Sequence, residues 1–209
     1  MARNLLLSLY RFVSRIILRA RLRNRNFSII TETCIGGIIY HELGMQFLSP
    51  TINCWMEDPD FFKFIRNLKH YMACDLRFVD GIEDTPTAYC DDILIHFNHY
   101  KTNEEAAAKW YERRQRINWN NLFIITSDRP SANQSVSDED ILLLNEIPCK
   151  GKVVFSLRDI PNCDYLLKLN KDPNGDYVGR YMTDKNKFGI WKWERRFDYV
   201  GWLNDGKLK

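Results

Sequence analysis

The first 25 residues contain no acidic side chain, although seven arginines lie among them. The rest of the chain carries 23 basic and 27 acidic residues, so the net charge of +3 hides a basic arm followed by a mildly acidic remainder. Outside the arm, no stretch is basic enough to follow a phosphate backbone. We therefore expect no nucleic-acid partner.

A long apolar run is also missing. In the basic arm the apolar residues are interrupted at Arg11 and Arg15, and the run is far shorter than the roughly 20 residues that span a bilayer. A secretory signal needs a longer apolar core and a small-residue cleavage site, and neither is seen. A transit peptide, which is also rich in arginine and poor in acids, remains an alternative.

The arm has the pattern of an amphipathic helix. Its apolar residues recur at helical spacing: Leu5, Leu6, Leu9, Phe12, Val13, Ile16 and Ile17. We expect residues 1–25 to lie on an anionic membrane surface, where each basic residue contributes about 1 kcal/mol. The expected location is cytoplasmic, peripheral on the inner face of the bacterial plasma membrane. The alternative is a helix packed on its own domain or on a partner.

Metal-binding and disulfide spacings are absent. The chain has no C-x-x-C pair and no zinc-ligand spacing. Without a convincing signal peptide, we expect reduced, mostly buried thiols in a cytosolic protein, with no metal and no cofactor. The cysteines in question are Cys34, Cys54, Cys74, Cys90, Cys149 and Cys163.

An apolar content of 45% is enough for a sizeable core. Strand-like stretches alternate with helical patterns, which is typical of βα units. We predict one α/β domain over residues 26–209, Rossmann-like, with a mostly parallel sheet, helices on both faces and an aromatic C-terminal segment. The expected strands are "NFSIIT", "DLRFVD", "DDILIHFNHY", "NLFIITS" and "GKVVFSL".

We expect a helix over residues 57–74 with Asp58 as its cap, and a short earlier helix that Gly44 ends. A T-x-x-E capping box, Thr102 with Glu105, opens another expected helix, and Ser137 caps a further one.

Neither G-x-G-x-x-G nor a P-loop occurs in the sequence. The stretch "TETCIGG", Thr31 to Gly37, is nevertheless a strand end followed by a helix start, where α/β folds bind phosphate. The backbone N–H groups of the Cys34–Gly37 turn, which includes Gly36, could face an anion. The alternative is an ordinary turn with two flexible residues.

Two acidic pairs are candidates for chemistry. Asp58 and Asp60 form a D-x-D, a metal-binding pattern in sugar-nucleotide enzymes, but the pair is equally a helix start beside Pro59. Asp91 and Asp92 precede a strand, and acids at strand ends of α/β folds often face the ligand crevice. Asp128, in "SDRP", is placed equally well.

The stretch "HFNHYKTNEEAAAKWYERRQRIN" combines two histidines with a basic helix. Lys109, Arg113 and Arg116 share one helix face, which could bind a diphosphate, since arginine binds phosphate with two hydrogen bonds. Salt bridges within the helix explain Lys109 and Arg116 as well, but leave Arg113 and Arg114 less well explained. We expect one histidine, of His96 and His99, to be buried and the other to act as a base or phosphate contact.

Three segments together resemble a known family. They are "NFSIITETCIGGIIYHELGMQFLSPTIN", "DFFKFIRNLKHYM" and "DDILIHFNHYKTNEEAAAKWYERRQRINWNNLFII". Over roughly residues 26–157, the chain resembles an uncharacterised bacterial family of unknown function, loosely described as exopolysaccharide biosynthesis proteins. The family pattern more often has Asn or Ser near Glu32 and Trp near Ile35, so Glu32 is set aside as a shared catalytic acid. The matching positions are Cys34, Gly36, Gly37, Ser49, Pro50, Asn53, His99, Tyr100, Trp110, Arg113 and Arg116.

The resemblance implies a glycosyltransferase of capsule or exopolysaccharide assembly. The donor would be a nucleotide-diphosphate sugar, with galactofuranose as one option, and the acceptor a lipid-linked glycan. Arg113, with Arg116 or Arg114, would neutralise the departing diphosphate, and Asp92 or His99 would be the general base. The matching positions Ser49, Asn53 and Tyr100 would line the substrate site.

Two other classes of function stay open. One is an acyl- or phospho-group transferase with Ser49 or Cys34 as nucleophile, although neither lies in a recognised nucleophile motif. The other is a non-enzymatic assembly module bound to the membrane by its arm.

Overall fold

A parallel sheet of four strands forms the centre of the molecule. The computed structural model describes residues 2–80, 84–129, 135–170, 178, 185 and 191–208. The strands lie in the order β1 (Ser28–Thr31), β5 (Leu122–Ser127), β6 (Gly151–Ser156) and β7 (Leu166–Lys168), and every neighbouring pair is parallel. The predicted α/β class with a mostly parallel sheet is confirmed.

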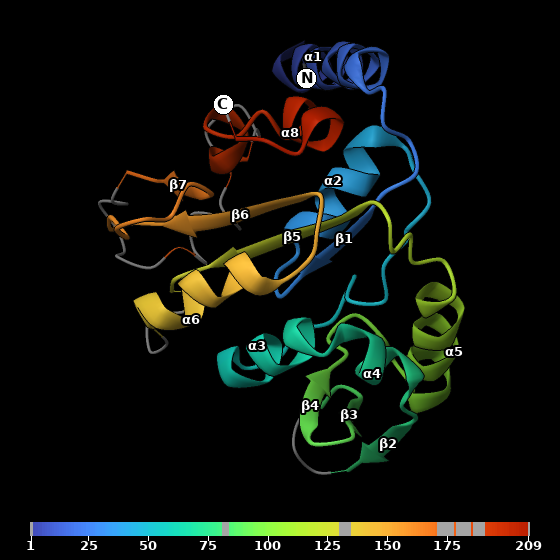
Figure 1. Cartoon of the computed structure of the whole chain (residues 1–209). Helices are drawn as coiled ribbons and strands as arrows, with labels where there is room; N and C mark the ends of the chain where they lie inside the picture. Colours follow the sequence, from blue (N-terminus) through green and yellow to red (C-terminus); the bar gives the residue numbers. More distant parts are fainter. Residues whose placement is uncertain are drawn as a thin grey trace.

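The sheet is covered on both faces, as Figure 1 shows. Because side chains alternate along a strand, Ile29 and Phe123 point to one face, while Ile30 and Ile124 point to the other. On the first face lie α2 (Ile35–Leu43), η2 (Lys192–Arg195) and α8 (Tyr199–Asp205). The aromatic C-terminal segment packs here, as predicted; Trp193, Phe197, Tyr199 and Trp202 are all buried in this core.

The second face shares one apolar core with a second group of helices. They are α3 (Asp58–Arg66), α4 (Leu68–Ala73), α5 (Asn103–Arg114), α6 (Asp138–Leu142) and η1 (Leu143–Glu146). The capping predictions hold at two helix starts: Thr102 Oγ1 accepts the Glu105 N–H at 3.2 Å, and Ser137 Oγ accepts the Asp140 N–H at 3.1 Å. These side chains satisfy backbone donors that would otherwise be unpaired.

A second, antiparallel sheet lies beyond α3 and α4. Its strands are β2 (Leu76–Val79), β3 (Thr87–Cys90) and β4 (Ile93–His96). The stretches around β2 and β4 were predicted as members of the parallel sheet, and this part of the prediction is wrong. The intervening β3 joins β4 through the two-residue turn Asp91–Asp92, which only antiparallel strands allow.

The helix predicted over residues 57–74 is two helices. Asn67, with φ −121° and ψ 37°, separates α3 from α4. The cap of α3 is Glu57 rather than Asp58, so that Asp58 and Pro59 both lie within its first turn. Pro59 fits there because the first turn of a helix has no intrahelical N–H partner to lose.

The basic arm forms α1 (Ala2–Arg21), which packs along α2 and α8 (Figure 1). Arg15 makes two hydrogen bonds to the Glu42 carboxylate, at 2.7 and 2.9 Å, and Arg21 pairs with Asp198 at 2.6 Å. A row of apolar side chains on α1 is instead exposed: Leu9, Phe12, Val13, Ile16 and Ile17, each between 46% and 62%. Among the described residues, no helix is long and apolar enough to cross a membrane.

Candidate active site

Glu32 directly follows β1 and is buried at the carboxyl edge of the parallel sheet. Its Oε2 accepts a hydrogen bond from Thr126 Oγ1 at 2.7 Å. Its Oε1 accepts one from the Ser127 N–H at 2.8 Å and one from Ser127 Oγ at 3.1 Å. The Glu32 carboxyl group, just after β1, is thus hydrogen-bonded to the end of β5.

Burial raises the pKa of Glu32 to about 8, and the negative charge of Asp58 adds to this effect. The three donors from Thr126 and Ser127 stabilise the carboxylate and offset part of the rise. Glu32 is therefore mostly protonated at neutral pH. Groups with such displaced pKa values, placed at a cleft, are candidates for proton-transfer chemistry.

Asp128 repeats this arrangement one strand further along. It directly follows β5 and is only 3% exposed. Its Oδ2 accepts a hydrogen bond of 2.7 Å from Ser156 Oγ, at the end of β6, and lies 3.0 Å from Arg158 Nε. Burial raises the pKa of Asp128, while Ser156 and Arg158 favour its charged form. Each buried acid therefore binds the end of the neighbouring strand.

A cavity of about 200 Å³, the strand-end cavity, opens beside Glu32. Three residues predicted for the site come together in its wall, namely Cys34, Asn53 and His99. Trp55 adds an aromatic face, because its ring stacks on that of His96 at 3.9 Å between centroids and its Nε1 donates to Asn98 Oδ1 at 2.7 Å. His96 is the buried histidine and His99 the exposed one, as expected.

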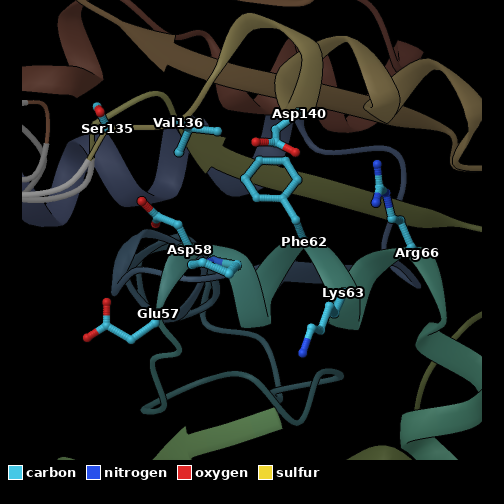
Figure 2. A pocket seen from close by; sticks show the side chains of 9 residues that line it. Glu57, Asp58, Phe62, Lys63, Arg66, Ser135, Val136 and Asp140 are labelled. Carbon is cyan, nitrogen blue, oxygen red and sulfur yellow. The ribbon is translucent and has the colours of Figure 1, made fainter. Parts of the chain in front are cut away.

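A larger cavity of about 430 Å³, the α3 cavity, lies at the start of α3. Figure 2 shows Asp58 and Glu57 at one end of it, Asp140 above Phe62, and Arg66 at the other end. Asp58 Oδ1 is buried and has no hydrogen-bond partner among the described residues. Burial raises the pKa of Asp58 to about 6, with further contributions from the charges of Glu57 and Asp140.

Arg66 is the cation of this cavity with the most freedom to bind a ligand. It is exposed, and within the described ranges no hydrogen bond or salt bridge holds its guanidinium. Lys63, also in the wall, lies 3.2 Å from Asp92 and 3.9 Å from Asp60. An unpartnered arginine and a carboxyl group with a pKa near 6 thus line the same cavity.

Several other predicted site residues surround the loop of residues 46–54. Arg113 is buried, and its Nη1 donates to the Ile52 carbonyl at 2.9 Å and to the Tyr100 hydroxyl at 2.6 Å. Tyr100 donates to the same carbonyl at 3.3 Å. Ser49 is fully buried, within 3.1 Å of Thr51 Oγ1. These residues hold the backbone that presents Asn53, whose φ of 68° places it in the left-handed region.

Arg116 and Arg114 also bind the protein itself. Arg116 forms an ion pair with Glu112 and donates to the Phe47 carbonyl at 3.4 Å. Arg114 donates to the Cys74 carbonyl at 2.7 Å and lies over the Tyr111 ring. The helix salt bridge considered for Arg116 is therefore formed. Arg113 and Arg114 lie at the end of α5 and Arg116 two residues beyond it, and the three do not converge on one open anion site.

Asp92 lies away from both cavities, in the turn between β3 and β4. It accepts hydrogen bonds from Tyr71 OH at 2.7 Å and Lys63 Nζ at 3.2 Å, and these two partners lower its pKa. Asp92 precedes β4 and His99 follows it, so the two predicted bases flank opposite ends of one strand. The structure does not bring them together.

Gly36 and Gly37 lie inside the first turn of α2 rather than in a flexible loop. A Cβ on Gly36 would come within 2.7 Å of Thr31 Cγ2, and one on Gly37 within 3.2 Å of Ile52 Cγ2. Their small size therefore allows α2 to approach β1 and the 46–54 loop closely. Cys34, just before α2, is exposed, and the surrounding protein raises the pKa of its thiol.

The two aspartates of the D-x-D pair have different surroundings. Asp58 faces the α3 cavity, whereas Asp60 Oδ2 accepts the Leu94 N–H at 2.8 Å. Sequence reasoning assigned no role in the site to Glu32, Trp55 or Arg66. The signal that could have found Glu32 is its position directly after a buried strand, the same rule that singled out Asp128.

The chain belongs to the family described as a domain of unknown function (DUF1919), whose model matches residues 7–204. It is also 32% identical over 196 residues to an uncharacterized protein of Haemophilus influenzae, which covers 92% of this chain and 91% of that protein. The resemblance to an uncharacterised bacterial family is thereby confirmed.

Proposed function

We propose that this protein is a glycosyltransferase of capsule or exopolysaccharide assembly, with Asp58 as its general base. The observation that carries the proposal is the α3 cavity, where Asp58, whose pKa is raised to about 6, is combined with Arg66, a cation that has no partner among the described residues. In transfer from a nucleotide-diphosphate sugar, a base near neutrality can take the acceptor proton and a cation can stabilise the leaving phosphate.

In the proposed reaction, an acceptor hydroxyl attacks the anomeric carbon of the donor sugar. Asp58 takes the hydroxyl proton, the new glycosidic bond forms, and the bond to the nucleotide diphosphate breaks. Arg66, assisted by Lys63, stabilises the negative charge on the departing diphosphate. This role was expected for Arg113, but that guanidinium is already bound to Ile52 and Tyr100.

The strand-end cavity is proposed to bind the acceptor glycan. Asn53 and His99 offer hydrogen-bonding groups, and Trp55 offers an aromatic face for a sugar ring. Glu32, protonated at neutral pH, adds a hydrogen-bond donor that a carboxylate could not supply. With a pKa of about 8, Glu32 stays mostly neutral at pH 6, whereas Asp58, with a pKa of about 6, titrates there.

The lipid-linked nature of the acceptor is supported by α1. Its exposed apolar row would insert at a membrane surface, while the arginines Arg15 and Arg21 are engaged with Glu42 and Asp198. We therefore expect apolar burial, more than attraction to anionic lipid, to drive membrane binding. The inner face of the plasma membrane is the proposed location.

The acyl- or phospho-transferase alternative is less well supported. Ser49 is fully buried and bonded to Thr51, so its hydroxyl has no access to substrate. Cys34 is exposed, but its raised pKa disfavours the thiolate that acts as nucleophile. The assembly-module alternative predicts membrane binding with no affinity for nucleotide sugars.

The donor site is tested by thermal shift of the full chain against a panel of nucleotide-diphosphate sugars, with Mn²⁺ or with a chelator. A donor at 100 times its dissociation constant adds about 2.7 kcal/mol of stability. Arg66→Ala should weaken the binding about 10-fold or more, because a charged hydrogen bond contributes about 1.5–3 kcal/mol.

Lys69→Ala is the matched control, since Lys69 is an exposed cation outside the α3 cavity, with its Nζ 5.9 Å from the centroid of the Trp119 ring. It should leave donor binding unchanged. A folded protein that binds no nucleotide-diphosphate sugar would refute the transferase and favour the assembly module. Equal losses in both variants would refute the role of Arg66.

Membrane binding is tested separately by sedimentation with lipid vesicles. Ile16→Asp, in the middle of the apolar row, should abolish binding, because a charge would have to enter the headgroup boundary. Ser14→Asp, in a half-buried position on another face of α1, is the control. Binding that survives Ile16→Asp but disappears in vesicles without anionic lipid would contradict the apolar mode.

A further inference from the structure

We propose that His70, Cys74 and Asp91 form a zinc site between the end of α4 and the β3–β4 turn. The imidazole Nε2, the thiol Sγ and a carboxylate oxygen of these residues all lie within 4.8 Å of one another. Together they offer the nitrogen, sulfur and oxygen ligands that Zn²⁺ takes in proteins. The site is independent of the α3 cavity and of the proposed transferase activity.

Two structural elements position the three ligands. His70 lies in α4, and Cys74 caps the end of that helix four residues later, so their side chains share one face. Asp91 is the first residue of the β3–β4 turn, with a φ of 57°. An aspartate tolerates this left-handed conformation better than most residues, and the turn aims its carboxylate at α4.

Of the two separations, the sulfur–nitrogen one fits tetrahedral coordination as it stands, and the nitrogen–oxygen one fits after a shift of the exposed side chains. Bonds of about 2.3 Å to sulfur and about 2.0 Å to nitrogen and oxygen, at tetrahedral angles, place sulfur and nitrogen about 3.6 Å apart and nitrogen and oxygen about 3.3 Å apart. The distance from Cys74 Sγ to His70 Nε2 is 3.6 Å. The distance from His70 Nε2 to Asp91 Oδ2 is 2.7 Å, a hydrogen bond that must open slightly. Both side chains are 55% exposed and have room to do so.

The alternative interpretation is a surface hydrogen bond between His70 and Asp91, with the Cys74 thiol nearby by coincidence. That pair needs no cysteine, whereas the observed group adds a soft ligand at the separation that zinc requires. On binding, the Cys74 thiol releases its proton to solvent, and the neutral imidazole carries its proton on Nδ1 so that Nε2 can bind the metal. Three protein ligands leave the fourth position of the ion to water.

Nearby groups support the site without binding the ion. Asp92 is held by Tyr71 and Lys63, which fixes the turn beside Asp91. Cys90 is buried next to Cys74 and donates its thiol proton to the Tyr71 carbonyl at 3.3 Å. Lys63 also lines the α3 cavity, so the turn that carries the zinc ligand is tied to the cavity wall.

The test is titration of the full chain with Co²⁺, a spectroscopic substitute for Zn²⁺, followed by competition with Zn²⁺. We expect one equivalent to bind with a thiolate-to-metal absorption band in the near ultraviolet. Cys74→Ser should abolish this band. His70→Ala and Asp91→Asn should each weaken binding at least about 100-fold, beyond the 10- to 100-fold cost of outer-shell changes.

Cys163→Ser is the matched control, because Cys163 is also a half-buried free thiol but lies outside the group. It should keep both the band and the affinity. Circular dichroism checks that each variant is folded. If Cys74→Ser does not fold, the loss of binding in Asp91→Asn is the test instead. Absence of the band, its persistence in Cys74→Ser, or its loss in Cys163→Ser would each overturn the assignment.

Discussion

The carboxyl edge of the parallel sheet and the β3–β4 turn each carry two carboxyl groups that follow strands. These groups are buried at the sheet edge but exposed in the turn. At the sheet edge, Glu32 and Asp128 are buried and their pKa values are raised. In the turn, Asp91 and Asp92 are exposed, and hydrogen bonds from Tyr71 and Lys63 lower the pKa of Asp92. Carboxyl groups are therefore shifted toward the protonated form at the sheet edge, whereas the Asp92 carboxylate is held in its charged form in the turn.

The difference follows from the topology. Parallel strands end together, so side chains that follow them are covered by the neighbouring strand ends and by the loops above the sheet. A two-residue antiparallel turn projects into solvent, and the side chains of Asp91 and Asp92 stay 55% and 58% exposed. Acids for proton transfer are thus expected at the sheet edge, and acids for binding a cation are expected at the turn.

The largest expected effect separates a buried acid, Asp58 of the α3 cavity, from the exposed acids of the turn by activity. Asp58→Asn removes the proposed base with little change in volume and should lower the transfer rate about 100- to 10,000-fold. In the wild type the rate should rise as pH increases through about 6, because the base acts only when unprotonated. The measurement is transfer from the donor identified by thermal shift to a lipid-linked acceptor.

Asp92→Asn is the comparison, since it makes the same change in the turn. We expect a rate within about twofold of wild type, because exposed charge pairs contribute little. A loss in Asp92→Asn as large as that in Asp58→Asn would move the chemistry to the turn. A pH profile that falls through pH 6 would mean that Asp58 acts as an acid instead.

Much of the fold could be predicted because local signals agree with the tertiary structure. The buried strands β1, β5 and β6, the caps Thr102 and Ser137, and the end of α2 at Gly44 all lie where the sequence placed them. Gly44 has a φ of 64°, the left-handed conformation that ends a helix. The antiparallel sheet was missed because four-residue strands do not reveal their partners.

The candidate site was less predictable, because a sequence does not show what a charged group binds. Arg113 has the composition and spacing of a phosphate ligand, but its partners are a backbone carbonyl and Tyr100. The proposed zinc ligands show why spacing rules fail for sites built across elements: a helix end and a turn bring His70 and Asp91 together, although two strands, β2 and β3, lie between them in the sequence.

The smaller expected effect is on the free energy of unfolding, and it reports on Glu32, a buried acid of the sheet edge. Glu32 has a pKa of about 8 in the folded protein and an ordinary value of 4.5 when exposed. Between these values the unfolded chain releases the proton while the folded chain keeps it, so the free energy of unfolding falls as pH rises. The loss approaches about 1.4 kcal/mol per pH unit for one such group and ends above pH 8.

Glu32→Gln removes this dependence while keeping an uncharged side chain of similar shape. Urea unfolding at pH 5.5 and 7.5 should show that the variant gains about 2 kcal/mol relative to wild type between the two values. Asp58 and Glu194, whose pKa values are also raised, titrate in both proteins, so their contributions largely cancel. A pH-independent difference between variant and wild type would mean that Glu32 is already ionised at pH 5.5. Its three hydrogen-bond donors would then outweigh its burial, and the sheet edge would hold a fixed charge like that of the turn.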